Sequence, residues 1–353
     1  MAMLQPTAWA RSMAWGCVAM ALAIGADRVW AEPTPWVDWP TFGPEVDGLE
    51  LRGHTNELPD FVGPIDGTAR LVVFTEGNHF PVLLPMVYDE FAAWVAQRPG
   101  LEPIEPGDVL VVTLPQVMVV RALTSGSIRV GNATLRVTPQ GGVFPHVVMG
   151  GAGPMGRLAE AGIVSDTATP FAKHRGMGML LRRGATDEFD GLDDLVAADT
   201  PIVFATPGEA GARRQYRQTL QALVGTEATD RLFAREIGDF PGRLKIQHRD
   251  VPYALLTGQA DAGLIFGHLA AFYADAFPDR LRYVAVDEAE PFGQSILAAT
   301  TPARGAGDAL AEAFVAFVLE RGRAAYPAGG FADAEAFDHG ETVSLNPPST
   351  GPR

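Results

Sequence analysis

The chain has 353 residues, of which 47% are hydrophobic and 20% charged, a composition that can bury a large core and is not typical of a disordered chain. Its formal net charge of -15 excludes the basic surface that binding to nucleic acid or to anionic lipid requires. The one cysteine, Cys17, lies in a predicted export signal, so we expect the exported chain to contain no disulfide, thiol nucleophile or thiolate metal ligand.

Residues 1–31 have the pattern of a secretory signal peptide. Arg11 provides a positive charge, residues 13–25 provide a short apolar stretch, and residues 29–31 have small side chains at the two positions that signal peptidase reads. We therefore predict cleavage before Glu32 and a periplasmic location. The apolar stretch is short for a membrane span, and an uncleaved N-terminal anchor is the alternative.

Residues 32–67 are rich in proline, tryptophan and glycine and predict an irregular N-terminal extension. We expect Trp36 and Trp39 to dock this extension on the folded body, because tryptophan is highly buried on average. Binding of a partner through these tryptophans is the alternative.

From residue 69 onward, apolar stretches of strand length alternate with stretches of helical periodicity. In the strand expected at 70–74, residues 71–74 form a continuous apolar run, which is typical of a strand buried on both faces, and residues 80–97 carry apolar side chains at helical spacing. The alternation predicts an α/β fold. Further strands are expected at 108–112, 133–137, 143–149, 176–181, 201–204, 262–266, 282–286 and 295–299, and further helices at 117–123, 192–197, 212–223, 251–257 and 309–320.

Four loops that follow predicted strands combine small residues with hydrogen-bonding groups and lead into helices. They are Thr75–His79, Thr113–Gln116, Gly150–Gly153 and Thr206–Gly211. In open α/β sheets, ligands bind beyond the carboxyl ends of the strands, where free N–H groups at helix starts favour an anion or a carbonyl oxygen. The alternative for each loop taken singly is an ordinary turn or helix cap.

The sequence contains none of the common catalytic motifs. It has no Gly-x-Ser-x-Gly elbow, no phosphate-binding Gly-x-x-x-x-Gly-Lys-Ser/Thr loop and no His-Glu-x-x-His helix. Residues 150–156 (GGAGPMG) lack the glycine spacing of a dinucleotide-binding loop, and Pro154 interrupts the expected helix start. We therefore predict a protein that is not an enzyme and that carries no cofactor.

Two groups of residues could hold a charged ligand. Glu76, His79 and His268 would together offer the nitrogen and oxygen ligands that zinc, iron or manganese uses, although ordinary hydrogen-bonded loop histidines are the alternative. Arg213 and Arg214 open a predicted helix and could pair with an oxyanion, whereas a solvated helix face is the alternative.

Several segments match one known family when they are taken in chain order. They are 71–79 (LVVFTEGNH), 113–116, 145–163, 171–181, 205–223, 314–331 and, most specifically, 249–266 (RDVPYALLTGQADAGLIF). In this order the segments resemble the type 2 periplasmic solute-binding proteins, and within them the molybdate/tungstate-binding component of ABC importers.

The resemblance implies two α/β lobes that are joined by two strand crossovers and that close on a ligand by a hinge motion. Lobe one would comprise residues 68–175 plus 292–340, lobe two would comprise residues 176–291, and residues 341–353 would form a tail.

The resemblance also implies ligand contacts and shows three departures. Asn78 falls where the family commonly has a ligand-binding serine, and Val251 would contribute a backbone N–H at a helix start. Phe266 stands where molybdate binders usually have a tyrosine, Glu76 would repel a dianion unless it is turned away or protonated, and Thr113–Gln116 lacks the usual serine pair. The departures favour a changed ligand: another oxyanion, a metal ion or complex, or a small polar organic molecule.

We predict a monomeric, exported solute-binding protein that captures a small ligand, with an oxyanion such as molybdate or tungstate favoured, and delivers it to an ABC importer. The alternatives are an exported metal-binding, sensor or accessory protein that uses Glu76, His79 and His268, and an exported enzyme on the same scaffold. The predicted ligand-binding residues are Thr75, Glu76, Asn78, His79, Thr113, Gln116, His174, Thr206, Arg213, Val251, Phe266 and His268.

Overall fold

The computed structural model describes residues 37–40, 61–130, 133–245, 248–286 and 293–345. The predicted signal peptide and Trp36 lie outside these residues. Among the described residues, no helix is both long and apolar enough to cross a membrane.

The larger of two main sheets has seven strands among the described residues, in the order β1-β3-β2-β7-β13-β8-β14. The strands β2, β3 and β7 run parallel, and β13 pairs antiparallel with β7 and β8. The bounds are β1 (Phe61–Val62), β2 (Leu71–Glu76), β3 (Val109–Leu114), β7 (Val147–Gly151), β8 (Thr167–Lys173), β13 (Ser295–Thr300) and β14 (Val343–Ser344).

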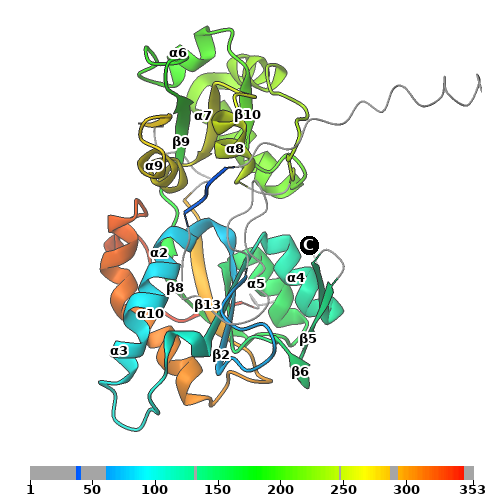
Figure 1. Ribbon diagram of the computed structural model, residues 1–353, viewed down its shortest axis with the longest axis vertical. Helices are drawn as coiled ribbons and strands as arrows, with labels where there is room; N and C mark the ends of the chain where they lie inside the picture. Colours follow the sequence, from blue (N-terminus) through cyan, green and yellow to red (C-terminus); the bar gives the residue numbers. More distant parts are fainter. Residues whose placement is uncertain (1–36, 41–60, 131–132, 246–247, 287–292, 346–353) are drawn as a thin grey trace, which may run out of the picture. The chain divides into compact units, whose positions relative to one another are not determined.

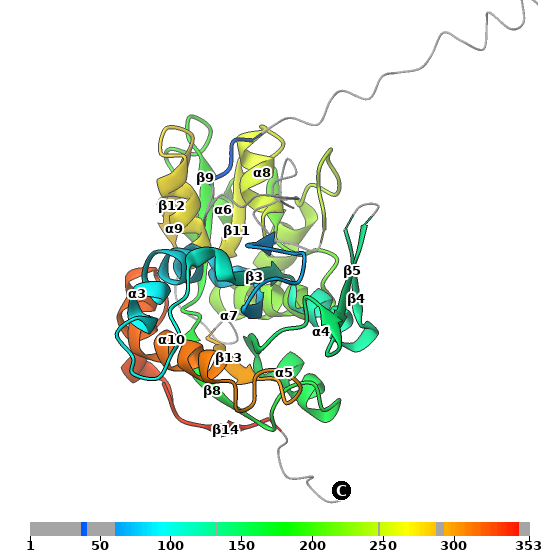
Figure 2. The same cartoon turned by 60° about the horizontal axis from the view of Figure 1, so that its bottom comes forward.

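A smaller sheet has the order β10-β11-β9-β12. Its strands β10 and β11 are parallel, and β9 runs antiparallel to both β11 and β12. A third sheet consists of the short strands β4, β5 and β6 and lies beside α4 (Figure 2). The bounds are β9 (Met177–Arg182), β10 (Ile202–Phe204), β11 (Ala262–Phe266), β12 (Leu281–Ala285), β4 (Ser127–Val130), β5 (Ala133–Thr138) and β6 (Gly141–Gly142).

The helices divide between the two main sheets (Figure 1). The larger sheet packs with α4 (Gln116–Ser125), α5 (Ala152–Glu160), α10 (Ala309–Ala328) and a continuous helical stretch made of η2 (Gly77–His79), α2 (Phe80–Pro85), η3 (Met86–Phe91) and α3 (Ala92–Val95). The smaller sheet packs with α6 (Leu192–Ala197), α7 (Ala210–Ala234), α8 (Asp250–Leu256) and α9 (Gly267–Ala276).

The core follows from the alternation of side chains along buried strands. In β2 every residue is buried, and Leu71 and Val73 belong to one hydrophobic cluster whereas Val72 and Phe74 belong to another. Successive side chains of a strand point to opposite faces, so a continuous apolar run feeds two cores at once. The α/β class and the buried first strand are as the sequence predicted.

Three expectations on secondary structure need correction. The strand expected at 143–149 begins only at Val147, because Pro145 interrupts the run. The strand β8, which pairs with both β13 and β14, was missed, since Pro170 lies within it. Residues 343–344 of the predicted tail are a strand of the larger sheet.

The N-terminal extension does dock through Trp39, which is 9% exposed. Its ring packs edge-to-face against Tyr273 and Phe277 of the smaller-sheet region, with centroids 6.0 and 5.9 Å apart. Edge-to-face aromatic pairs of this kind stabilise beyond the area that they bury.

Candidate functional site

A cavity of about 500 Å³ is lined by residues from both main sheets. The larger sheet contributes the carboxyl ends of β2, β3 and β7, which is where parallel strands of an α/β sheet place a ligand. On the side of the smaller sheet, the wall is formed by the start of α7 and by the end of β11. The polar residues that line the cavity are Glu76, Asn78, Thr113, Gln116, Arg157, His174, Glu209, Gln215, His248, Arg249, Tyr273, Gln294 and Ser295.

Glu76 and His174 form a buried pair in the wall of this cavity. The Nε2 atom of His174 lies 3.0 Å from Oε1 of Glu76, and the two side chains are 6% and 8% exposed. Burial opposes ionisation of Glu76, the hydrogen bond with His174 favours it, and the pKa of that carboxyl lies below its usual value. Glu76 is therefore an ionised carboxylate at neutral pH.

Glu209 brings a second carboxyl to the same cavity from the side of the smaller sheet. It occupies the N-cap position of α7. Burial, followed by the negative charges of Glu76 and Asp250, raises the pKa of Glu209 to about 8. Glu76 and Glu209 thus line the same cavity.

The start of α7 forms a wall of the cavity with its backbone. Residues 208–212 line the cavity, and the N–H groups of a helix's first turn have no partner within the helix. The preceding loop is fixed by backbone hydrogen bonds: Gly208 donates to the carbonyl of Lys245, and Glu209 donates to that of Thr206 over 3.0 Å. Thr206 itself has a φ of 52°, a left-handed conformation that is unusual for this residue type.

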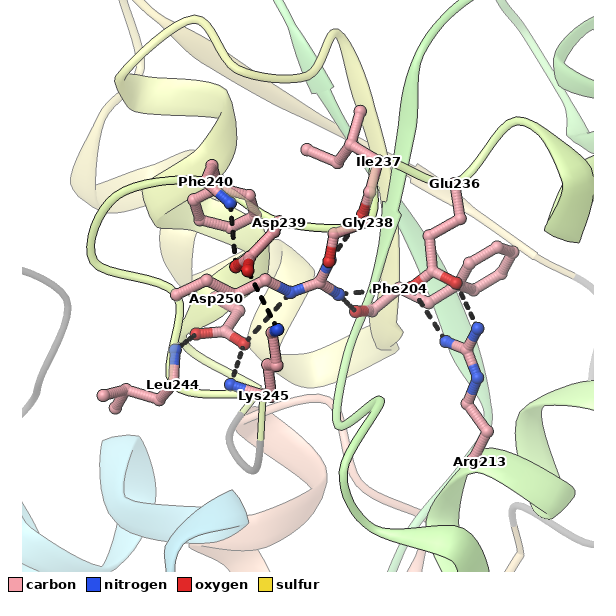
Figure 3. A network of polar contacts seen from close by, with 11 residues as sticks. Phe204, Arg213, Glu236, Ile237, Gly238, Asp239, Phe240, Leu244, Lys245 and Asp250 are labelled. Carbon is pink, nitrogen blue, oxygen red and sulfur yellow. Dashed lines mark hydrogen bonds and ion pairs between the residues drawn. The ribbon is translucent and has the colours of Figure 1, made fainter.

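A buried ionic network holds the loop that supports α7 (Figure 3). The Arg243 side chain is 1% exposed and lies 3.1 Å from Oε1 of Glu236 and 3.6 Å from Oδ2 of Asp250. Asp250 in turn accepts hydrogen bonds from the backbone N–H groups of Leu244 and Lys245, each at 2.8 Å. This network fixes the carbonyl of Lys245 beneath the α7 start.

Aromatic rings pack at the inner end of the cavity. The Phe266 ring stacks on His174 with centroids 4.4 Å apart and lies 4.7 Å from the ring of His248. His248 is hydrogen-bonded through Nδ1 to the hydroxyl of Tyr216 over 3.0 Å. Burial lowers the pKa of His248 to about 3, so this histidine is neutral at physiological pH.

Six of the predicted ligand-binding residues line the cavity together: Glu76, Asn78, Thr113, Gln116, His174 and Phe266. Each of the six lies within two residues of the end of a strand.

Thr75 and His79 do not line the cavity but form a buried cluster behind it. The Nε2 atom of His79 lies 2.5 Å from the hydroxyl of Thr75, and its Nδ1 atom lies 2.7 Å from the hydroxyl of Tyr326. Burial lowers the pKa of His79 to about 4. Both ring nitrogens are thus engaged in holding β2 against α10.

The three residues considered for a metal are each engaged elsewhere. Glu76 binds His174, His79 binds Thr75 and Tyr326, and Nε2 of His268 lies 2.6 Å from the carbonyl oxygen of Asn78. Within the described residues, no group of three or more His, Cys, Asp or Glu side chains is arranged to hold a metal ion. The geometry therefore does not bring this set together.

Thr206, Arg213 and Val251 are absent from the cavity wall. Thr206 is buried in the loop before α7, and Arg213 forms a two-pronged ion pair with Glu236. The N–H of Val251 donates to the carbonyl of His248 over 3.2 Å, so it is not free for a ligand. These residues support the site and do not contact its interior.

The sequence interpretation missed Glu209, His248, Arg249, Gln215 and Gln294. Glu209 lies inside a loop that was singled out, and Arg249 begins the most specific of the matched segments. The sequence placed these two residues in segments that were singled out, but it does not show which cavity the side chain of a loop residue faces.

Residues 125–332 match the family model of bacterial extracellular solute-binding proteins. No curated protein matches the chain.

The chain is similar in structure to several solved proteins. A sulfate-binding protein from Mycobacterium tuberculosis aligns with a TM-score of 0.54 at 14% identity, over 75% of this chain and 87% of that one. The periplasmic molybdate-binding protein of Azotobacter vinelandii aligns with a TM-score of 0.50 at 16% identity, over 74% of this chain and 99% of that one. At such low sequence identity, these structural similarities show a shared fold alone. Because the family model spans more than half of the sequence, the chain belongs to the bacterial extracellular solute-binding proteins.

Proposed function

We propose that this chain is exported, captures a small solute in the cavity between its two main sheets and delivers that solute to an ABC importer. The observation that carries the proposal is the cavity itself, which is lined jointly by the carboxyl ends of β2, β3 and β7 and by the start of α7. A ligand that contacts both walls would stabilise a closed arrangement of the two halves.

No catalytic role is part of this proposal. Members of the family are binding proteins. Every polar group named in the cavity wall can act by hydrogen bonding or by charge, and ligand capture requires nothing more.

An oxyanion such as molybdate or tungstate is the ligand that the sequence resemblance favours. The first-turn N–H groups of α7 and the Arg249 side chain would support an anion. Glu76 opposes it, because an ionised carboxylate repels a dianion. The cavity volume of about 500 Å³ is also within the range of roughly 300–1,000 Å³ that is typical of organic ligands.

The test is a thermal-shift screen of the mature chain, beginning at residue 32, after treatment with a chelator. The panel contains molybdate, tungstate, sulfate, phosphate, divalent metals, organic acids and organic amines. A ligand present at 100 times its Kd adds about 2.7 kcal/mol of stability, which corresponds to a rise in Tm of several degrees.

A matched pair of variants locates the binding event. Asn78 lines the cavity, whereas Gln259 is exposed on a turn elsewhere. Asn78→Ala should weaken the ligand response and Gln259→Ala should leave it unchanged. An equal response in both variants would place binding outside this cavity, and no response to any compound by the wild-type chain would count against solute capture.

A further inference from the structure

The cavity contains two carboxyl groups that reach it from different sheets. Glu76 is 6% exposed and ends β2, and Glu209 caps α7 on the other wall. Glu76 is held by His174. Within the described part of the chain, the Glu209 carboxyl has no hydrogen bond or ion pair. Two carboxylates facing one cavity repel each other unless a proton or a cation lies between them.

A second observation comes from His174. This residue is 5% exposed and lines the cavity, and its Nδ1 atom is buried without a hydrogen-bond partner among the described residues. Its Nε2 atom donates to the Glu76 carboxylate, so in the neutral ring Nδ1 carries a lone pair. A buried acceptor without a donor is costly, and a ligand N–H would satisfy it.

On the assumption that the proposed solute-binding function holds, we propose that the solute is a small organic molecule with a protonated nitrogen, which binds between Glu76 and Glu209. A protonated amine or guanidinium with three or more N–H hydrogens can donate to both carboxyls and to Nδ1 of His174. The volume of the cavity, about 500 Å³, leaves room for the organic remainder of such a molecule.

The other charged groups of the cavity fit the remainder of the solute. Arg249 is buried and Arg157 is exposed at the cavity wall. Gln116 presents a buried Nε2 donor that has no hydrogen-bond partner among the described residues, at the larger-sheet wall. These donors, with the α7 start, suit a carbonyl, hydroxyl or carboxylate oxygen on the same molecule.

A bare metal ion fits less well. No three metal-ligating side chains converge in the described part of the chain. A protonated nitrogen needs only acceptors at hydrogen-bond distance, whereas zinc needs at least three protein ligands at about 2.0–2.3 Å from one point.

Proton release gives the proposal a measurable signature. Burial and the charges of Glu76 and Asp250 raise the pKa of Glu209 to about 8, so this carboxyl is mostly protonated at pH 7 in the free protein. His174, His248 and Arg249 also face the cavity. A cationic nitrogen beside Glu209 would ionise it and release close to one proton, whereas an anionic ligand would keep the proton in place.

The experiment pairs each cation with a neutral molecule of the same shape. Putrescine is compared with 1,4-butanediol, arginine with citrulline, and choline, which lacks N–H donors, with 3,3-dimethylbutanol. Molybdate, sulfate and succinate serve as anions. We expect at least one N–H-bearing cation to raise the Tm and its neutral counterpart to have no effect. Calorimetry in buffers of different ionisation enthalpy should then show proton release at pH 7.

The Glu209→Gln variant tests the site directly. An amide has the shape of the neutral carboxyl, so the fold should be retained while affinity for the cation falls roughly 10- to 100-fold. The control is Glu227→Gln on the same helix, whose side chain is 90% exposed. It should bind the cation as the wild type does.

The outcomes separate the two proposals. A Tm rise with anions alone, or unchanged cation affinity in Glu209→Gln, would overturn the cationic class and leave solute capture intact. Cation binding accompanied by proton uptake would also overturn the cationic class, because a cation beside Glu209 should release a proton. No Tm rise with any member of the panel would count against both the cationic class and the solute-binding function.

Discussion

Replacing Arg243 by methionine should destabilise the protein more than any surface substitution. The Arg243 side chain is 1% exposed, and its guanidinium contacts Glu236, Asp250 and the carbonyl oxygens of Ile237, Gly238 and Phe204. Methionine fills a similar volume but provides no charge and no N–H donor. The Asp250 side chain, which is fully buried, would then lose the charge of Arg243 beside it.

The structure sets the magnitude of this effect. Removing one partner of a buried ion pair costs about 3–5 kcal/mol, because the remaining charge is left uncompensated. A chain of this size should lose on the order of 5–15 °C in Tm for that change in the free energy of unfolding.

The assay is thermal or urea unfolding of the wild type beside a matched surface variant. Arg231→Met removes an exposed pair with Glu227, in which the side chains are 54% and 90% exposed, and should cost less than about 1 kcal/mol. The double variant Arg243→Met/Asp250→Asn should lose less free energy of unfolding than the sum of the two single losses, because the asparagine leaves no buried negative charge beside the methionine. A loss of under 1 kcal/mol in Arg243→Met would refute the reasoning that this buried network stabilises the fold.

Three further predictions concern the cavity and pH. Gly150→Ala would place a Cβ 1.8 Å from Nε2 of Gln116, so the Gln116 side chain should leave its position and ligand affinity, measured by calorimetry, should fall with little change in Tm. The control Gly153→Ala, where a Cβ meets no atom within 4 Å, should leave ligand affinity unchanged. Between pH 4.5 and about 8, folded Glu209 holds a proton that the unfolded chain has lost, so the stability that Glu209 contributes falls as pH rises. The Tm of Glu209→Gln should therefore decline less steeply from pH 5 to 8.5 than the Tm of the wild type, and parallel Tm profiles of the two proteins would contradict this. Burial, followed by the charge of Arg304, lowers the pKa of His146 to about 4, so the stability that neutral His146 contributes is present above pH 6.5 and lost as pH falls toward 4. His146→Gln should therefore lose less Tm than the wild type between pH 7 and 4.5, and an equal loss would assign the acid lability to other groups.

The sequence by itself determined the class of the fold and indicated the edge of the sheet where the cavity lies. Runs such as residues 71–74 and 262–266 are apolar throughout because both faces of their strands are buried, and that pattern is visible without coordinates. Loops that follow such strands must emerge at the carboxyl edge of the sheet. Asn78, Thr113 and Gln116 could therefore be placed in the cavity wall from the sequence.

Only the tertiary structure decided which polar groups meet. Glu76 and His174 are 98 residues apart in sequence, and nothing local to either one indicates their pairing. His79 and Thr206 lie in loops that the sequence singled out, but both side chains are buried in the fold, where His79 contacts Thr75 and Tyr326. Arg213, which could have paired with an oxyanion or formed part of a solvated helix face, pairs with Glu236, which lies just beyond the far end of α7. Local patterns determine which residues reach an edge, whereas the direction and the partners of a side chain depend on contacts between distant segments.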